Sequence, residues 1–273
     1  MPSNYHPELD TSPSLDDDKI RLYQSYVGIL RWTVELGRID ISLPTSLMAT
    51  YMACPHADHM RKLLMIFGYL KMHLNTRLVF DPKVRNWNHI PWVSADWSEF
   101  YPDACEVIPD NMPESRGNEV QLNVFVDAAH ATDIVTRISV TGILIYLNGA
   151  PIRWYSKRQN TIEPSTFGSE FVAMKIAVEI IEGIRYKLRM MGIPLEGSAN
   201  VFGDNDSVVK NATKPESTLK KKHNSVAYHK VRESAAAGAV RIAHEPGVKN
   251  VADMLTKILG AQKMKKCAQC CLF

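Results

Sequence analysis

Four acidic residues in the second half of the chain are placed where their carboxylates could bind divalent metal ions. Asp127 and Asp204 each end a short apolar run, LNVFVD and ANVFGD, that is typical of a β-strand. Glu170 falls near the start of one predicted helix, and Asp253 falls in the first turn of another. Hard divalent cations prefer carboxylate oxygens, and two such cations about 3.5–4 Å apart can hydrolyse a phosphodiester bond. The four residues are therefore candidate metal ligands and catalytic groups.

Each of these carboxylates also has a simpler interpretation. An aspartate after a strand often forms a turn or caps a helix, and Glu170 and Asp253 could merely complement helix dipoles. Adjacent strands ending in Asp127 and Asp204 would favour the metal interpretation. Two neighbouring carboxylates repel each other, and a shared cation would offset this repulsion. Spacing alone leaves both interpretations open.

A series of strands and helices is predicted between residues 121 and 259, and it must position these side chains. Asn148-Gly149 separates apolar runs at 138–147 and 151–157, which predicts a β-hairpin after the first strand. Ser165 fits the N-cap of a long helix. Further patterns predict a strand at 199–204, helices at 206–212 and 218–236, a strand at 239–244 and a helix at 250–259. We expect an α/β fold with a mixed sheet flanked by helices.

The rest of the chain divides by composition. The first residues are polar and include the run Asp16-Asp17-Asp18, helical periodicity follows, and a stretch rich in Pro, Trp and Asp then shows no sustained period. We expect a disordered leader at 1–19, a helical subdomain at 20–75, a connector at 76–120 and a basic Cys-rich tail at 260–273.

Composition excludes several classes of protein. The 273 residues (30.8 kDa) are 45% hydrophobic and 22% charged, which suits one large domain or two modest ones with a buried core. No apolar run reaches 18 residues, so no membrane-spanning helix is expected. The polar N-terminus does not resemble a secretory signal, and five cysteines are too few and too clustered for a disulfide framework. We expect an intracellular protein, cytoplasmic or nuclear.

The formal net charge of +3 is unevenly distributed, because acidic residues predominate in 1–120 and basic residues in 121–273. A basic half indicates a site for a polyanion, and basic side chains could follow the phosphates of a nucleic acid. A solubilising surface is the alternative interpretation. The candidate nucleic-acid-binding residues are Arg153, Lys157, Arg158, Lys220, Lys221, Lys222, Lys230 and Arg232.

Short motifs in a fixed order carry a resemblance to a known family. They are Asp127-Ala128, RISVTG at 137–142, WYSKRQ at 154–159, Ser169-Glu170-Phe171, Gly203-Asp204-Asn205, YHKVRE at 228–233 and ADMLTK at 252–257. Together they resemble the ribonuclease H domain of copia-type retrotransposon Pol polyproteins. Residues 26–40 and 59–71 are similar to the end of the reverse transcriptase that precedes this domain.

This resemblance implies a ribonuclease H-like fold, with a five-stranded mixed sheet and flanking helices, preceded by a small helical subdomain. It implies that Asp127, Glu170, Asp204 and Asp253 hold two Mg²⁺ ions, with Mn²⁺ as a substitute. The implied function is metal-dependent endonucleolytic hydrolysis of the RNA strand of RNA–DNA hybrids, by a fragment of a retrotransposon-derived polyprotein. The alternative is a catalytically silent nucleic-acid-binding module derived from such a domain.

The C-terminal tail has one further motif. Cys270-Cys271-Leu272-Phe273 has the spacing of a prenylation box and follows basic residues. A weak prenyl anchor at Cys270 is one expectation, and an end without such a role is the other, which we prefer.

Overall fold

The computed structural model describes residues 1–2, 4–219 and 222–272. Its α-helices are α1 (Asp17–Glu35), α2 (Ser42–Ala49), α3 (Ala57–Met72), α4 (Thr166–Met190), α5 (Asp206–Thr213), α6 (Ser225–Ala236) and α7 (Ala261–Ala268). Its strands are β1 (Leu122–Ala129), β2 (Val140–Leu147), β3 (Ala150–Arg158), β4 (Ala199–Gly203) and β5 (Val240–His244). Short 3₁₀ turns are η1 (Pro7–Leu9), η2 (Ile39–Ile41), η3 (Lys222–Asn224) and η4 (Val251–Leu255).

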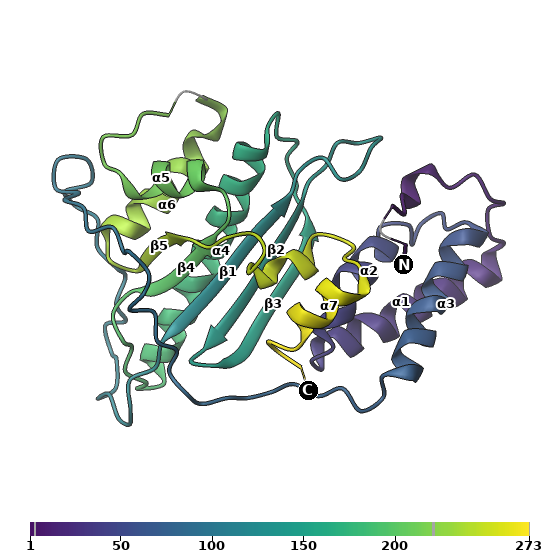
Figure 1. Ribbon diagram of the computed structural model, residues 1–273, viewed down its shortest axis with the longest axis horizontal. Helices are drawn as coiled ribbons and strands as arrows, with labels where there is room; N and C mark the ends of the chain where they lie inside the picture. The colour runs from purple at the N-terminus through teal and green to yellow at the C-terminus, as the bar shows by residue number, and fades with distance from the viewer. Residues whose placement is uncertain (3, 220–221, 273) are drawn as a thin grey trace.

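The strands form one mixed sheet in the order β3-β2-β1-β4-β5 (Figure 1). β1, β2 and β3 are antiparallel neighbours, whereas β4 runs parallel to β1 and β5 runs parallel to β4. The hairpin between β2 and β3 turns at Asn148, whose φ of 56° is the left-handed conformation that Asn adopts more readily than most residues. The predicted α/β class and five-stranded mixed sheet are confirmed.

Both faces of the sheet are buried, but by different kinds of structure. The helices α4, α5 and α6 cover one face, and their apolar residues form a core with β1, β2, β4 and β5 (Figure 1). On the other face, η4 and α7 pack over Phe125, Tyr146 and Phe202. This layering explains why β1 is buried along its whole length, since neither face of it meets solvent.

The helices α1, α2 and α3 form a separate apolar cluster beside β3. Its centre is Tyr23, whose hydroxyl donates to the Met48 carbonyl at 2.8 Å. The segment predicted to be a disordered leader differs from that expectation: Pro7 is buried, His59 Nε2 hydrogen-bonds the Pro7 carbonyl at 2.9 Å, and α1 already begins at Asp17. Packing against α3 gives this polar segment partners that its composition does not reveal.

The stretch between α3 and β1 is irregular, as predicted, and largely exposed, but a few of its side chains pack against the sheet layers. Trp87 lies 4.5 Å from Phe202 between ring centroids and donates its indole N–H to Asn123 Oδ1 at 2.6 Å. Farther along, Glu106 binds Arg185 and Arg189 of α4, each at 2.5 Å. Burial by itself would raise the pKa of Glu106, but the two guanidinium groups outweigh burial and lower that pKa to about 2.

The C-terminal region differs from its prediction in two ways. The helix expected at 250–259 is only the 3₁₀ turn η4, capped by the Asn250 side chain, which accepts from the Ala252 N–H. The expected tail contains α7, after which Cys271 and Leu272 are buried against the sheet. Although Cys270 is exposed, its neighbours are part of the core, so the structure does not support a prenyl anchor there; Phe273 lies outside the described residues. Within the described part of the chain, no helix is both long and apolar enough to cross a membrane.

We expect Trp87→Ala to lower the free energy of unfolding by about 1–3 kcal/mol, because the change removes ring packing and a partly buried hydrogen bond. Urea denaturation followed by circular dichroism measures this. Val84→Ala, a truncation in the same segment at a half-exposed side chain, is the matched control and should stay within about 0.5 kcal/mol of the wild type. Equal stabilities of the wild type and Trp87→Ala would contradict the packing of this segment.

Candidate metal centre

Two of the four acidic residues meet because their strands are parallel neighbours. Val126 of β1 pairs with Gly203 of β4. Asp127 directly follows Val126, and Asp204 directly follows Gly203. The carboxyl ends of parallel strands commonly hold the ligand site of an α/β sheet. The sequence-based expectation that these two strands are neighbours is confirmed.

Glu170 joins them from the start of α4. The Ser165 side chain accepts from the Gly168 N–H and so fixes where the helix begins. A Cβ at Gly168 would lie within 3 Å of the Glu163 carboxylate and the Asn224 amide, so a larger residue there would require these side chains to move. Carboxylate oxygens of Asp127, Glu170 and Asp204 all lie within 4.8 Å of one another. The start of α4 therefore completes a group of three carboxylates.

Burial and mutual repulsion make this group electrostatically unfavourable without a cation. Burial, followed by the charges of Asp127 and Asp204, raises the pKa of Glu170 to about 9. Burial also raises the pKa of Asp127, although Lys257 and Thr256 act in the opposite direction. Three hard oxygen ligands this close together fit a divalent cation, which would stabilise the ionised forms of Asp127 and Glu170.

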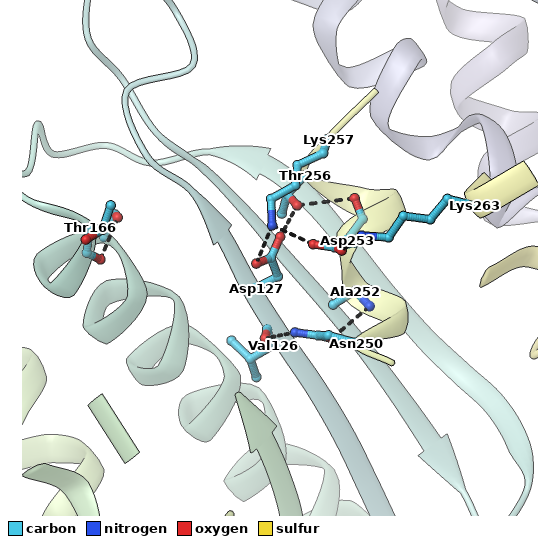
Figure 2. A network of polar contacts seen from close by, with 10 residues as sticks. Val126, Asp127, Thr166, Asn250, Ala252, Asp253, Thr256, Lys257 and Lys263 are labelled. Atoms are coloured by element: carbon cyan, nitrogen blue, oxygen red, sulfur yellow. Dashed lines mark hydrogen bonds and ion pairs between the residues drawn. The ribbon is translucent and has the colours of Figure 1, made fainter. Parts of the chain in front are cut away.

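The structure places Asp253 outside this group of three. Its carboxylate is 2% exposed and binds two ammonium groups, with Lys257 Nζ 2.5 Å from Oδ1 and Lys263 Nζ on Oδ2 (Figure 2). Lys257 Nζ also lies 3.1 Å from Asp127 Oδ1, so it links Asp253 to the three carboxylates. The four acidic residues therefore lie at one end of the sheet, but only three of them form a cation-sized group.

The turn η4 is held against β1 and β2 by polar contacts and by a glycine. Asn250 Nδ2 donates to the Val126 carbonyl at 2.9 Å (Figure 2). On β2, a Cβ at Gly142 would lie 2.6 Å from Thr256 Cγ2, so only glycine allows this close approach. The Thr256 hydroxyl in turn donates to Asp127 Oδ2. These contacts bring Asp253 and Lys257 to the carboxyl end of β1.

Sequence reasoning did not assign Thr256, Lys257 or Lys263 to the site, although all three contact the acidic residues. The spacing of Asp253 and Lys257, four residues apart, was a usable signal, since an acid and a base at that distance face each other on a helical turn. Lys263 carried no signal, because its approach depends on how α7 folds back.

Arg232 is not available to a nucleic acid, which corrects the prediction for this residue. It is 2% exposed, and its guanidinium donates to the carbonyls of Asn211, Lys214 and Pro215 and to the Ser217 hydroxyl. It therefore joins α6 to the segment that follows α5, and its charge is satisfied by carbonyl dipoles within the protein.

The other candidate basic residues differ in their surroundings. Lys230 binds both carboxylate oxygens of Glu182, and Arg158 binds Asp133 at 3.1 Å, so both are already paired. The exposed side chains are Arg153 and Lys157 on β3 and Lys222 in η3. Lys220 and Lys221 lie outside the described residues.

Comparison with known proteins identifies relatives of the chain. No protein-family model matches it. It is 25% identical over 237 residues to the retrovirus-related Pol polyprotein from transposon RE2 of Arabidopsis thaliana. The aligned residues make up 87% of this chain and 14% of that protein. For the corresponding polyprotein from transposon TNT 1-94 of Nicotiana tabacum the identity is 24%, over 90% of this chain and 16% of that one. The chain is thus similar in sequence to retrotransposon Pol polyproteins. This confirms the resemblance that the motifs predict, and the chain spans about one sixth or less of the length of these curated relatives.

Two solved structures are also similar. LC11-RNase H1 in complex with an RNA/DNA hybrid matches with a TM-score of 0.41 and 16% identity, over 50% of this chain and 94% of that one. The N-terminal RNase H domain from Mycobacterium tuberculosis, solved as a fusion protein, matches with a TM-score of 0.38 and 14% identity, over 55% of this chain and 98% of that one.

Without a divalent cation, Glu170 should make stability depend on pH. Between its ordinary pKa of 4.5 and its folded-state pKa of about 9, the unfolded carboxyl is ionised while the folded one keeps its proton. The folded state therefore loses up to about 1.4 kcal/mol of stability per pH unit as pH rises through this window. Glu170→Gln cannot ionise at this position. In EDTA, the difference between its free energy of unfolding and that of the wild type should therefore increase in favour of the variant from pH 5 to pH 8.

The matched control for this measurement is Glu179→Gln, an exposed position on the same helix. Its stability should follow the wild type at every pH. Parallel curves for Glu170→Gln and the wild type would show that Glu170 is not buried beside other carboxylates.

Arg232→Ala should lower the free energy of unfolding by about 2–4 kcal/mol, because it leaves several buried acceptors without a donor. Urea denaturation gives the value directly. The control is Arg153→Ala, at an exposed arginine, which should change stability by no more than about 0.5 kcal/mol. If both variants were as stable as the wild type, the structural role of Arg232 would be refuted.

Proposed function

We propose that this chain is a metal-dependent ribonuclease that hydrolyses the RNA strand of RNA–DNA hybrids. The observation that carries the proposal is the group formed by Asp127 and Asp204, at the carboxyl ends of β1 and β4, and Glu170, at the start of α4, whose carboxylate oxygens lie within 4.8 Å of one another. The relationship to retrotransposon Pol polyproteins supports the same function.

The three carboxylates would hold Mg²⁺, with Mn²⁺ as a substitute. The bound ion would supply an activated water and stabilise the developing negative charge on the phosphate. The protein's own contribution is positional. Asp127 is fixed by the Thr256 hydroxyl and by Lys257, Glu170 by the N-cap of α4, and Asp204 by the pairing of β4 with β1.

Binding of the hybrid would use exposed cations on β3 and on the neighbouring helix α1. Arg153 and Lys157 line a cavity of about 360 Å³ together with Arg31 of α1, and these three side chains are suited to phosphate oxygens. Selection of RNA over DNA would depend on contacts to the 2′-hydroxyl groups of the shallow minor groove. Lys220 and Lys221 stay predictions, as do the domain boundaries and the cytoplasmic or nuclear location.

The proposal is tested by cleavage of a hybrid labelled on its RNA strand, with and without Mg²⁺. We expect the wild type to cut in Mg²⁺, EDTA to abolish cutting while leaving hybrid binding largely intact, and Asp204→Asn to reduce the rate at least about 100-fold. Asp206→Asn is the matched control, because Asp206 lies two residues away, is exposed and pairs with Lys210.

Other outcomes would separate the alternatives. Hybrid binding without cleavage, unchanged in Asp204→Asn, would favour a catalytically silent binding module. Cleavage that persists in EDTA would rule out the metal-dependent mechanism.

A further inference from the structure

Lys257 places an ammonium group among the acidic residues of the proposed metal centre. Its Nζ lies 3.1 Å from Asp127 Oδ1 and 2.5 Å from Asp253 Oδ1 (Figure 2). The side chain is 41% exposed, whereas the carboxylates of Asp127 and Asp253 are 1% and 2% exposed. The ammonium therefore bridges two buried carboxylates from the solvent side.

Both oxygens of each of these two carboxylates already have a donor. Asp127 Oδ1 binds Lys257 and its Oδ2 accepts from the Thr256 hydroxyl. Asp253 Oδ1 binds Lys257 and its Oδ2 binds Lys263. A second divalent cation between Asp127 and Asp253 would lie next to the Lys257 ammonium, and the two positive charges would repel each other.

Glu170 and Asp204 are different. Across the described residues, neither carboxylate forms an ion pair with a Lys, Arg or His side chain. The acidic region therefore has two sides. The side toward Glu170 and Asp204 has no cation of its own, and the side toward Asp253 is neutralised by lysines.

Charge balance gives the same division. Four ionised carboxylates carry four negative charges, which the ammonium groups of Lys257 and Lys263 and one divalent cation balance completely. With both lysines in place, a second divalent cation would leave two positive charges in excess beside the buried carboxylates of Asp127 and Asp253, and such an imbalance is unfavourable.

We propose that the Lys257 ammonium takes the position of a second cation, so that this centre binds a single divalent ion, at Asp127, Glu170 and Asp204. This inference rests on the proposed function, because it assumes that the three carboxylates bind a metal. Asp253 is then a positioning residue, which holds Lys257 and does not itself bind the metal.

Isothermal titration calorimetry with MnCl₂ tests the inference by counting ions. We expect one Mn²⁺ per chain for the wild type and two for Lys257→Met, which removes the charge and keeps an unbranched side chain only one atom shorter. Lys265→Met, on the exposed side of α7, is the matched control and should bind one. Thermal unfolding of each variant, monitored by circular dichroism, establishes that it is folded.

Asp253→Asn provides an independent measurement if Lys257→Met does not fold. It should still bind one Mn²⁺, with an affinity within about threefold of the wild type, because Asp253 is not a ligand. A loss of one bound ion in this variant would overturn the inference.

The remaining outcomes separate the inference from the proposed function. Two Mn²⁺ ions per wild-type chain would overturn the inference and leave the proposed function standing. One ion in both the wild type and Lys257→Met would also overturn it, since the lysine would not be what excludes the second ion. No Mn²⁺ binding by the wild type would refute the proposed metal centre itself.

Discussion

The central constraint in this protein is the repulsion between carboxylates that the fold forces together in a buried place. Parallel pairing of β1 with β4 sets Asp127 beside Asp204, and the start of α4 adds Glu170. Such an arrangement is costly for the folded chain, because each ionised carboxylate raises the free energy of the others. Much of the surrounding structure either tolerates this repulsion or reduces it.

Two solutions to that repulsion lie side by side. Around Asp253, the chain supplies its own cations, from Lys257 after η4 and from Lys263 on α7. Around Glu170, the chain supplies none within the described residues, and the pKa of that carboxyl is raised to about 9. The protein therefore keeps one part of the acidic region neutral by itself and leaves the other part dependent on protonation or on an external cation.

The sequence predicted the parts of this site that depend on local pattern. Asp127 and Asp204 were found because each ends an apolar strand, and Glu170 because Ser165 marks the start of a helix. The contacts of Asp253 were not predicted, because Lys263 reaches it only after α7 folds back across the sheet. Proximity of that kind depends on tertiary packing, which periodicity does not encode.

The same distinction explains the errors elsewhere. Arg232 has the charged side chain typical of a phosphate-binding residue, but its guanidinium donates to carbonyl groups of another segment. The helix expected at 250–259 is shortened to η4 because its turn is fixed by contacts with β1 and β2 rather than by helix propensity. In both cases the partners come from distant parts of the chain.

The packing of residues 76–120 has a consequence for how the chain can be divided. Trp87 covers Phe202, and Glu106 joins this irregular segment to α4, while Leu272 covers the same face of the sheet from the other end of the chain. A recombinant piece cut at the apparent borders of the sheet region, residues 121–259, would lose both coverings. The sheet face that carries Phe125, Tyr146 and Phe202 would then be exposed to solvent, and such a piece would tend to self-associate.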